Sequence, residues 1–195
     1  MKRIFDLCVS LTILLLFLPF GMIISLLIAL ESRGGIFYRQ KRVGKNGIEF
    51  NLLKFRTMKP NSDRLGQLTV GMRDPRITRI GYFLRKTKLD EFPQFINVLS
   101  GEMSIVGPRP EVKAYVDLYN ADQRKILQVK PGITDYASLE YFDENRLLGE
   151  ASDPHEMYIR EIMPAKLKLN EKYLENPSVW KDIHVMWSTF KKMLR

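Results

Sequence analysis

Cysteine and histidine are nearly absent from this sequence of 195 residues. Cys8 is the single cysteine, so no disulfide can form within the chain and nothing requires an oxidising compartment. The two histidines, His155 and His184, lie far apart and lack the spacing of zinc ligands. Internal repeats and low-complexity tracts are also absent. These absences exclude a disulfide-stabilised domain and give no indication of a zinc site, and the length suits one compact domain with a membrane element.

Acidic residues are too few to balance the basic ones. The 31 lysines and arginines exceed the 22 aspartates and glutamates, which gives a formal net charge of +9. Such an excess predicts an anionic partner, which could be nucleic acid, an anionic membrane surface or a phosphorylated small molecule. The charge by itself does not choose among these three.

Charged residues are missing altogether from Leu7 to Leu30. A helix of about 24 residues is ~36 Å long, which is enough to cross a hydrocarbon layer of ~30 Å. A cleaved signal peptide fits poorly, because the apolar run is too long and no small-x-small cleavage site follows it. The segment therefore predicts a membrane helix, which could either span the bilayer or enter and leave on one side.

Two features favour the re-entrant path over the spanning one. Pro19 lies near the middle of the segment, where it removes a helical hydrogen bond and costs ~3 kcal/mol in a regular helix. Positive charge prefers the cytoplasmic side, and a spanning helix would place one basic flank outside. The flanking basic residues are Lys2 and Arg3 before the segment, and Arg33, Arg39, Lys41 and Arg42 after it.

The rest of the chain predicts an α/β fold that is mostly α. Two β-rich runs surround the Gly44–Gly47 turn and predict a β-hairpin. Short helices are expected at 77–85, 92–99, 111–119 and 121–129, the last with Asn120 as its cap and Pro131-Gly132 as its stop. We therefore expect two parts: a re-entrant membrane helix at 1–33, and a small, mainly helical catalytic domain at the membrane surface at 34–195.

The last predicted helix starts at Asn176-Pro177, a cap followed by proline at the first helical position. An apolar, tryptophan-bearing face with a basic end suits a helix lying in the lipid headgroup region. Packing on the protein's own core, or against a second copy, remains an equal alternative. The apolar stripe consists of Val179, Trp180, Ile183, Met186, Trp187, Phe190 and Leu194, and Lys191, Lys192 and Arg195 close the helix.

A pair of neighbouring carboxylates, Asp90 and Glu91, is the strongest chemical feature. Pro93 is tolerated only in the first turn of a helix, so both acids should lie at a helix N-terminus, with Thr87 or Asp90 as the cap. There the helix dipole should keep the pKa of Asp90 low. Capping alone would explain the pair, but Arg109 stands between two prolines and can present a planar fork to phosphate. Carboxylates with arginines nearby indicate a site for a metal-bound diphosphate.

Linked motifs then give the sequence a specific likeness. It resembles the bacterial sugar transferase family, the monotopic phosphoglycosyl transferases, in their small single-domain form. The likeness covers nearly the whole chain and is strongest from Ile36 to Thr134. The motifs that carry it, in order, are Lys54 to Met58, Arg73 to Gly81, Leu89 to Glu91, Asn97 to Ser104, Val106 to Glu111 and Lys130 to Thr134, together with the Pro-broken N-terminal segment.

The resemblance implies a two-step covalent mechanism. Asp90 matches the nucleophile that attacks the β-phosphorus of a UDP-sugar and expels UMP, and Glu91 matches the carboxylate associated with Mg²⁺. Arg56, Arg85 and Arg109 match basic positions around the phosphates. A polyprenyl phosphate, such as undecaprenyl phosphate, then takes the phospho-sugar, which is how such enzymes initiate bacterial glycan assembly. The implied location is the cytoplasmic face of the bacterial inner membrane, with membrane lipids and no nucleic acid as partners.

Two departures from the family pattern leave parts of this expectation open. Leu18-Pro19 stands where Ser-Pro is common, and Asp135 to Ser138 stands where many members have Gly-Trp-Ala-Gln. We expect this second segment and the chain up to Pro164 to bear on the choice of sugar. The sugar, the glycan pathway and the oligomeric state, a homodimer included, stay open. A rival reading is a membrane-anchored basic binding module, which would give no reason for the Asp90-Glu91 pair.

Overall fold

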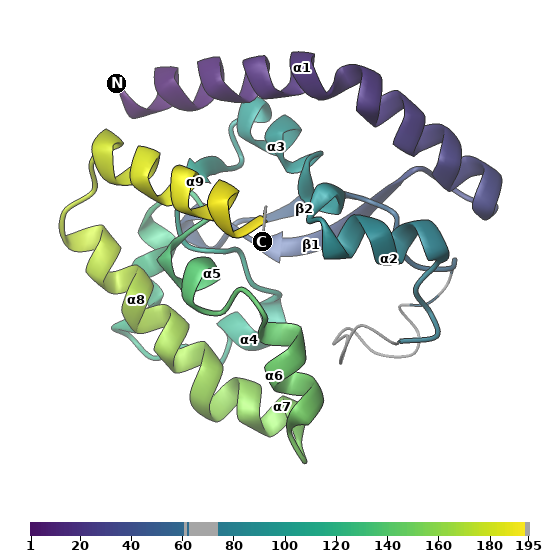
Figure 1. The fold of residues 1–195 in the computed structure, drawn as a ribbon. Coiled ribbons are helices and arrows are strands. Elements are labelled where there is room, and N and C mark those ends of the chain that lie inside the picture. Colours follow the sequence, from purple (N-terminus) through teal and green to yellow (C-terminus); the bar gives the residue numbers. More distant parts are fainter. Residues whose placement is uncertain (61, 63–73, 194–195) are drawn as a thin grey trace.

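The computed structural model of the protein describes residues 1–60, 62 and 74–193. Most of this part of the chain is helical, and the β-hairpin of β1 and β2 lies near the centre (Figure 1). A second, very short sheet consists of β3 and β4. The elements are, in order, α1 (Lys2–Glu31), β1 (Phe37–Val43), η1 (Lys45–Gly47), β2 (Glu49–Phe55), α2 (Arg79–Lys86), η3 (Leu89–Glu91), α3 (Gln94–Ser100), β3 (Ser104–Val106), α4 (Lys113–Val116), η4 (Gln123–Gln128), β4 (Gly132–Thr134), α5 (Tyr136–Glu140), α6 (Glu144–Glu150), α7 (Pro154–Met157), η5 (Tyr158–Ile162), α8 (Met163–Glu175) and α9 (Val179–Met193).

The N-terminal apolar segment forms one long helix, α1, with Pro19 inside it. Figure 1 shows that α1 bends in its second half as it passes along one side of the molecule. Its most apolar 18-residue window has a mean hydropathy of 2.8, yet only 11% of that window is buried. An apolar helix that exposes its side chains in this way suits a lipid environment. The re-entrant path and the division at residue 33 stay predictions.

Both ends of α1 are fastened to the rest of the chain. At the N-terminal end, the Lys2 ammonium donates to the Asp182 carboxylate of α9, with 2.5 Å between Nζ and Oδ2. At the C-terminal end, the Glu31 carboxylate accepts the backbone N–H of Arg79 at 2.7 Å and so caps the start of α2. Both ends of the helix are therefore held to the same body of the protein.

The predicted β-hairpin is confirmed. β1 and β2 pair antiparallel, with Phe37 opposite Phe55 at one end and Val43 opposite Glu49 at the other. The turn between them contains Asn46 at φ 59° and Gly47 at φ 77°, a left-handed conformation that asparagine and glycine adopt most readily. The turn was predicted from the sequence, whereas the register of the pair comes from the structure.

The helix predictions succeed in part. The helices expected at 77–85 and 92–99 are α2 and α3, and the Thr78 hydroxyl caps α2 by accepting the N–H of Gly81 at 2.9 Å. The helix expected at 111–119 shrinks to the four residues of α4, and that expected at 121–129 is a 3₁₀ helix, η4. Asp122 precedes η4 and makes no side-chain cap, so the expected cap at Asn120 is wrong, although the Asn120 side chain accepts the N–H of Gln123 at 2.9 Å.

The second sheet was not predicted from the sequence. β3 and β4 are three-residue strands that pair in parallel, with Ser104 opposite Gly132 and Val106 opposite Thr134. A Cβ atom on Gly132 would lie 2.1 Å from the backbone nitrogen of Gly107, so only glycine allows these backbones to approach so closely. Pro131-Gly132 therefore serves this pairing as well as ending η4.

The C-terminal helix begins at Val179, three residues after the expected cap. Asp182 and Val185 are buried on its inner face, whereas Trp180 is 82% exposed. Leu194 and Arg195, which complete the predicted stripe, lie outside the described residues. Exposure of the tryptophans leaves the headgroup-region location open as a prediction. The other exposed apolar residues of α9 are Ile183, Trp187 and Phe190.

Candidate active site

A large cavity lies between the β-hairpin, α1, α9 and the η3 turn, with a volume of about 1230 Å³. Its wall contains all five residues that the sequence analysis assigned to the site: Arg56, Arg85, Asp90, Glu91 and Arg109. One end of the cavity is apolar and the other is polar. We take the polar residues around η3 first, because they carry the chemistry.

The backbone around η3 places the two carboxylates differently from the prediction. Thr87 ends α2, and Lys88 adopts a left-handed conformation at φ 57°, which is costly for a residue with a side chain. Asp90 and Glu91 then fall in a 3₁₀ turn, and α3 starts only at Gln94. The expectation that Thr87 or Asp90 caps a helix is therefore wrong: no side chain caps η3 or α3.

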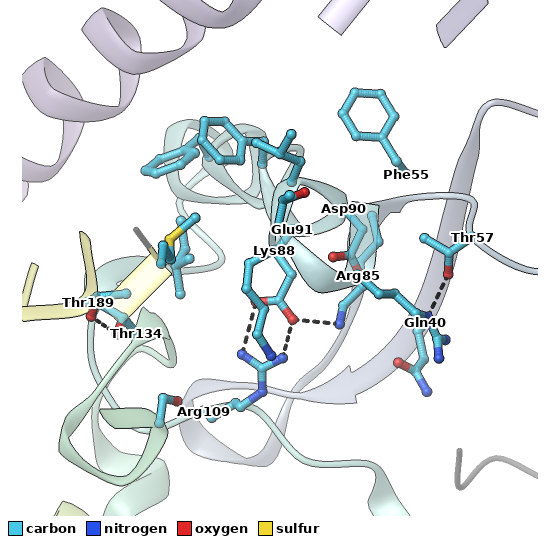
Figure 2. Close-up of a pocket in the computed structure, with 18 of the residues that line it drawn as sticks. Gln40, Phe55, Thr57, Arg85, Lys88, Asp90, Glu91, Arg109, Thr134 and Thr189 are labelled. Carbon is cyan, nitrogen blue, oxygen red and sulfur yellow. Dashed lines mark hydrogen bonds and ion pairs between the residues drawn. The ribbon is translucent and has the colours of Figure 1, made fainter. Parts of the chain in front are cut away.

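Glu91 is held by two cations (Figure 2). The Lys54 ammonium of β2 donates to its Oε1 at 3.0 Å, and the Arg109 guanidinium grips the same carboxylate with two nitrogens, one of them 3.2 Å from Oε2. Burial alone would raise the pKa of Glu91, but the charges of Arg109 and Lys54 outweigh it and hold that pKa well below its usual range. The same pairing raises the pKa of Arg109. Glu91 is thus ionised and fixed in place.

Asp90 lies in the opposite situation. Its residue surface is only 7% exposed, and within the described chain no hydrogen bond or ion pair engages its carboxylate. Burial raises the pKa of Asp90, an effect that the charges of Lys54, Arg85 and Lys88 partly offset. The low pKa expected from a helix dipole is therefore corrected, because the residue is buried and precedes α3 instead of capping it. A buried carboxylate without a partner is costly and points to a functional role.

The three arginines occupy different positions around this pair. Arg85 donates from Nε to the Thr57 hydroxyl at 2.9 Å, as the dashed line in Figure 2 marks, and burial lowers its pKa. Arg109 clamps Glu91, as described above. Arg56 instead turns toward the end of α1, where it donates to the Ser32 carbonyl at 2.7 Å and to the Arg33 carbonyl at 3.0 Å. Its role as a phosphate ligand stays a prediction.

Arg109 is positioned by the parallel strand pair. Its backbone N–H donates to Asp135 Oδ2 at 3.1 Å, and the other oxygen of that carboxylate accepts the N–H of Ser138 at 2.5 Å. Asp135, at the end of β4, therefore ties the Pro108-Arg109-Pro110 loop to the start of α5. In the structure the guanidinium of this loop is directed to Glu91, and its expected role as a phosphate ligand stays a prediction.

Lys54 and Lys88 also line the cavity but were not assigned to the site from the sequence. Lys54 is enclosed, and burial lowers its pKa although the charge of Glu91 opposes that effect. The Lys88 ammonium lies 5.2 Å from the ring centre of Phe142. Lys54 belongs to the recognised Lys54–Met58 motif, but only the folded chain reveals that it meets a carboxylate 37 residues away.

The apolar end of the cavity lies between α1 and α9. Phe17 of α1 stacks on Phe92, the residue after Glu91, with 4.1 Å between the ring centres. This contact connects α1 directly to the residue that follows the η3 turn. Across the cavity, Trp187 and Phe190 of α9 stack on each other at 5.9 Å. An apolar wall thus leads from exposed helices to the carboxylates.

The carboxylates could also hold a divalent metal ion. The described residues contain no group of three or more metal-ligating side chains. Mg²⁺, however, commonly takes one or two carboxylates and fills its remaining positions with water and substrate phosphates. Asp90 has both oxygens free of partners within the described residues, and Glu91 Oε2 accepts only one bond. This donor set fits Mg²⁺ bound together with a phosphorylated ligand.

Comparison with known proteins agrees with this arrangement. Residues 1–195 match the sequence model of the family described as bacterial sugar transferase. A UDP-N-acetylgalactosamine-undecaprenyl-phosphate N-acetylgalactosaminephosphotransferase of Aeromonas hydrophila is 35% identical over 99% of the chain, and a UDP-glucose:undecaprenyl-phosphate glucose-1-phosphate transferase of Escherichia coli K12 is 37% identical over 98%. The match spans only 43% and 40% of those two proteins. A Caulobacter vibrioides protein with the same name as the second is 33% identical over 99% of the chain and 69% of its own length.

Proposed function

The chain belongs to the bacterial sugar transferase family, and on that basis we propose that it transfers a sugar 1-phosphate from a UDP-sugar to undecaprenyl phosphate, releasing UMP. The names of the relatives support both substrates, since two of them describe a UDP-sugar donor and the undecaprenyl phosphate acceptor. Their differing sugars leave the donor's sugar open. The observation that carries the proposal is the environment of Asp90: a buried carboxylate without a partner in the described chain, facing a cavity among cations.

In the first step, an Asp90 oxygen attacks the β-phosphorus of the donor. The bond between that phosphorus and the bridging oxygen breaks, UMP leaves with the electron pair, and an aspartyl phospho-sugar remains. Like-charge repulsion opposes this approach, so positive charge must neutralise the phosphate oxygens. Lys88, Arg85 and Arg109 line the same cavity as Asp90 and could supply this charge.

In the second step, the phosphate of the lipid acceptor attacks the same phosphorus. The acyl phosphate bond breaks, which restores the Asp90 carboxylate and yields a polyprenyl diphosphate sugar. One site thus serves two bulky anions in turn. The apolar passage between α1 and α9 supports this order, because an isoprenoid tail can lie there while its phosphate reaches Asp90.

We further propose that Mg²⁺ is held by Glu91 together with the donor's phosphates, while Asp90 remains the nucleophile. Bound there, the ion would neutralise charge on the diphosphate. Glu91→Gln should lower the rate strongly and weaken its dependence on Mg²⁺, because the substituted amide is a poor ligand. The measurement is UMP release across a Mg²⁺ titration. An unchanged titration curve in this variant would remove Glu91 from the metal site.

For the membrane, we propose a re-entrant α1 with the catalytic part on the cytoplasmic face. Both ends of α1 are bound to the same body of the protein, which supports this path. Lys2 at one end pairs with Asp182, and Glu31 at the other end accepts the N–H of Arg79. A helix that crossed the bilayer would separate one of its ends from that body. The backbone groups freed at Pro19 then need partners within the protein or at the interface.

The direct test of the function combines product release with detection of the covalent intermediate. Purified protein is incubated with a panel of UDP-sugars and undecaprenyl phosphate, and UMP is measured. With donor alone, intact-protein mass spectrometry should find one phospho-sugar on the wild type and none on Asp90→Asn. Asp117→Asn, which removes an exposed carboxylate, is the control and should behave as wild type. UMP release with full turnover in Asp90→Asn would reject the mechanism.

A further inference from the structure

The polar end of the cavity continues past Arg109 into a buried network of charges. The network consists of Arg42 of β1, Glu111 of the Pro-Arg-Pro loop, Glu144 of α6, Tyr158 of η5 and Lys166 of α8, and all five line the cavity. None of the five has a role in the two-step transfer described above. They come from five separate segments, so only the tertiary structure brings them together.

Lys166 is the centre of this network. Its side chain is 9% exposed, and its ammonium lies 2.8 Å from Glu144 Oε2 and 3.9 Å from Glu111 Oε1. Arg42 pairs with the other oxygen of Glu111 at 3.2 Å, and the Tyr158 hydroxyl donates to Glu111 Oε1. Burying charges costs free energy that their pairing seldom repays in full, and well-packed apolar residues would stabilise the fold as well. A buried charge network beside a cavity therefore indicates a role in binding a ligand, in addition to any contribution to stability.

Two groups in this region still have hydrogen-bonding capacity. Glu144 keeps 27% of its side chain exposed, and among the described residues only its Oε2 takes part in an ion pair. The Ser138 hydroxyl of α5 is buried and has no hydrogen-bond partner in the described chain, although Ser138 lines the same cavity. A buried hydroxyl without a partner is costly unless a ligand or water satisfies it.

The charge balance indicates what kind of ligand suits this end. Two cations, Arg42 and Lys166, face two anions, Glu111 and Glu144, so the network is formally neutral. A phosphate would be repelled by the two carboxylates, whereas the hydroxyl groups of a neutral sugar can donate to them and accept from lysine. Phosphates should bind more favourably near η3, where the cations Lys88, Arg85 and Arg109 line the cavity.

The β1 strand gives the distance between the two regions. Tyr38, Gln40 and Arg42 alternate along the cavity side of the strand, and Tyr38 pairs in register with Lys54, the partner of Glu91. Four residues of strand span about 13 Å. That length accommodates a diphosphate near Asp90 and one sugar ring extending toward Arg42.

We propose that Glu144, Lys166 and Ser138 bind hydroxyl groups of the donor's sugar and determine which UDP-sugar is used. This inference rests on the proposed function, since it assigns the sugar of the same donor to this end of the cavity. Glu144 accepts a hydrogen bond from one sugar hydroxyl. Lys166 holds Glu144 in place and donates a hydrogen bond to a second hydroxyl. The Ser138 hydroxyl forms a hydrogen bond with a third hydroxyl, close to Arg109. A UDP-sugar whose corresponding hydroxyl has the opposite configuration would leave these buried groups without hydrogen-bond partners. This loss allows strong discrimination between UDP-sugars.

The test measures kcat/KM for UDP-sugars that differ at a single hydroxyl, such as UDP-glucose and UDP-galactose with their N-acetyl counterparts. We expect Glu144→Gln to lower kcat/KM for the preferred donor at least tenfold and to reduce its ratio to the epimer, with inhibition by UMP unchanged. Ser138→Ala should reduce the same ratio without disturbing the ion network. Glu150→Gln, an exposed change in the same helix, is the matched control and should alter neither value.

Each alternative outcome has a distinct signature. An equal loss for every donor in both Glu144→Gln and Ser138→Ala, with the ratio unchanged, would show a purely structural role and overturn the proposal. Weaker inhibition by UMP would assign this end of the cavity to the nucleotide and overturn it as well. If Glu144→Gln fails to fold, Ser138→Ala decides alone, because its hydroxyl makes no bond in the described chain. Absence of UMP release by the wild type from any donor would instead reject the proposed function itself.

Discussion

Asp90 and Glu91 are adjacent in the sequence, yet their carboxylates lie in opposite surroundings. Glu91 is gripped by Lys54 and Arg109, whereas Asp90 has no partner within the described residues and a raised pKa. Two acids with diverging pKa values commonly have different tasks. Here the free carboxylate suits a nucleophile, and the paired one suits a fixed charge beside a metal and phosphates.

The raised pKa of Asp90 leads to a prediction about stability. A carboxyl whose pKa is higher in the folded state stabilises the fold only while protonated: that contribution is complete below the ordinary pKa of ~3.9 and is lost as pH rises through the folded-state value. At pH 7 the charge therefore destabilises the protein. We expect Asp90→Asn to raise Tm by ~2–4 °C, the shift that about 1 kcal/mol produces at this size.

Differential scanning calorimetry at several pH values checks this expectation. The gain in Tm should shrink as the pH is lowered toward 4, since the wild-type carboxyl then becomes neutral too. The rate of UMP release by the wild type should fall over the same range, because the attacking group must be ionised. A variant with an unchanged or lower Tm at pH 7 would show that Asp90 does have a stabilising partner.

At the scale of elements, α2 is placed by a contact that only glycine permits. A Cβ atom on Gly81 would lie 2.0 Å from the carbonyl oxygen of Thr57, at the end of the hairpin. The same carbonyl accepts the N–H of Thr78 at 3.0 Å. This close approach brings Arg85 within hydrogen-bonding distance of the Thr57 hydroxyl.

We therefore expect Gly81→Ala to push α2 away from the hairpin. The displacement should cost about 1–3 kcal/mol of unfolding free energy, as overpacking does elsewhere, and lower the rate of transfer by separating Arg85 from Thr57. Lys86→Ala in the same helix is exposed and serves as the control. Urea unfolding together with UMP release measures both effects, and a Gly81→Ala protein with wild-type values would show that the contact relaxes freely.

The elements also show where local sequence signals suffice. The hairpin and α3 were predicted because a turn with left-handed residues and helical spacing of apolar residues act over a few neighbours. The parallel pair β3–β4 was missed because three-residue strands carry no periodicity. The helix expected at 121–129 is a 3₁₀ helix that covers only Gln123–Gln128.

For the whole molecule, the arrangement of α1 leads to a prediction about topology. With Cys8 replaced, single cysteines at positions 2 and 39 report the two flanks of α1. Because both ends of α1 are fastened to one body, we expect an impermeant thiol reagent to label neither position in intact cells and both after lysis. Labelling of one position alone in intact cells would establish a spanning helix and reject the re-entrant one.

The sequence by itself determined the features that depend on near neighbours and on composition. These are the apolar segment broken by Pro19, the positive charge, the hairpin turn and an acidic pair close to basic residues. Each follows from the intrinsic preferences of residues a few positions apart. Together with the motifs that carry the family resemblance, they were sufficient to name Asp90, Glu91 and Arg109 as candidate site residues.

Only the tertiary structure decided which side chains share the cavity and how they are charged. Lys54 meets Glu91 across 37 residues, Glu111 meets Lys166 across 55, and Lys2 meets Asp182 across 180. The burial that raises the pKa of Asp90 has the same origin, since it depends on segments packed around η3 from distant parts of the chain. Such contacts arise from the packing of the whole fold and leave no local pattern in the sequence.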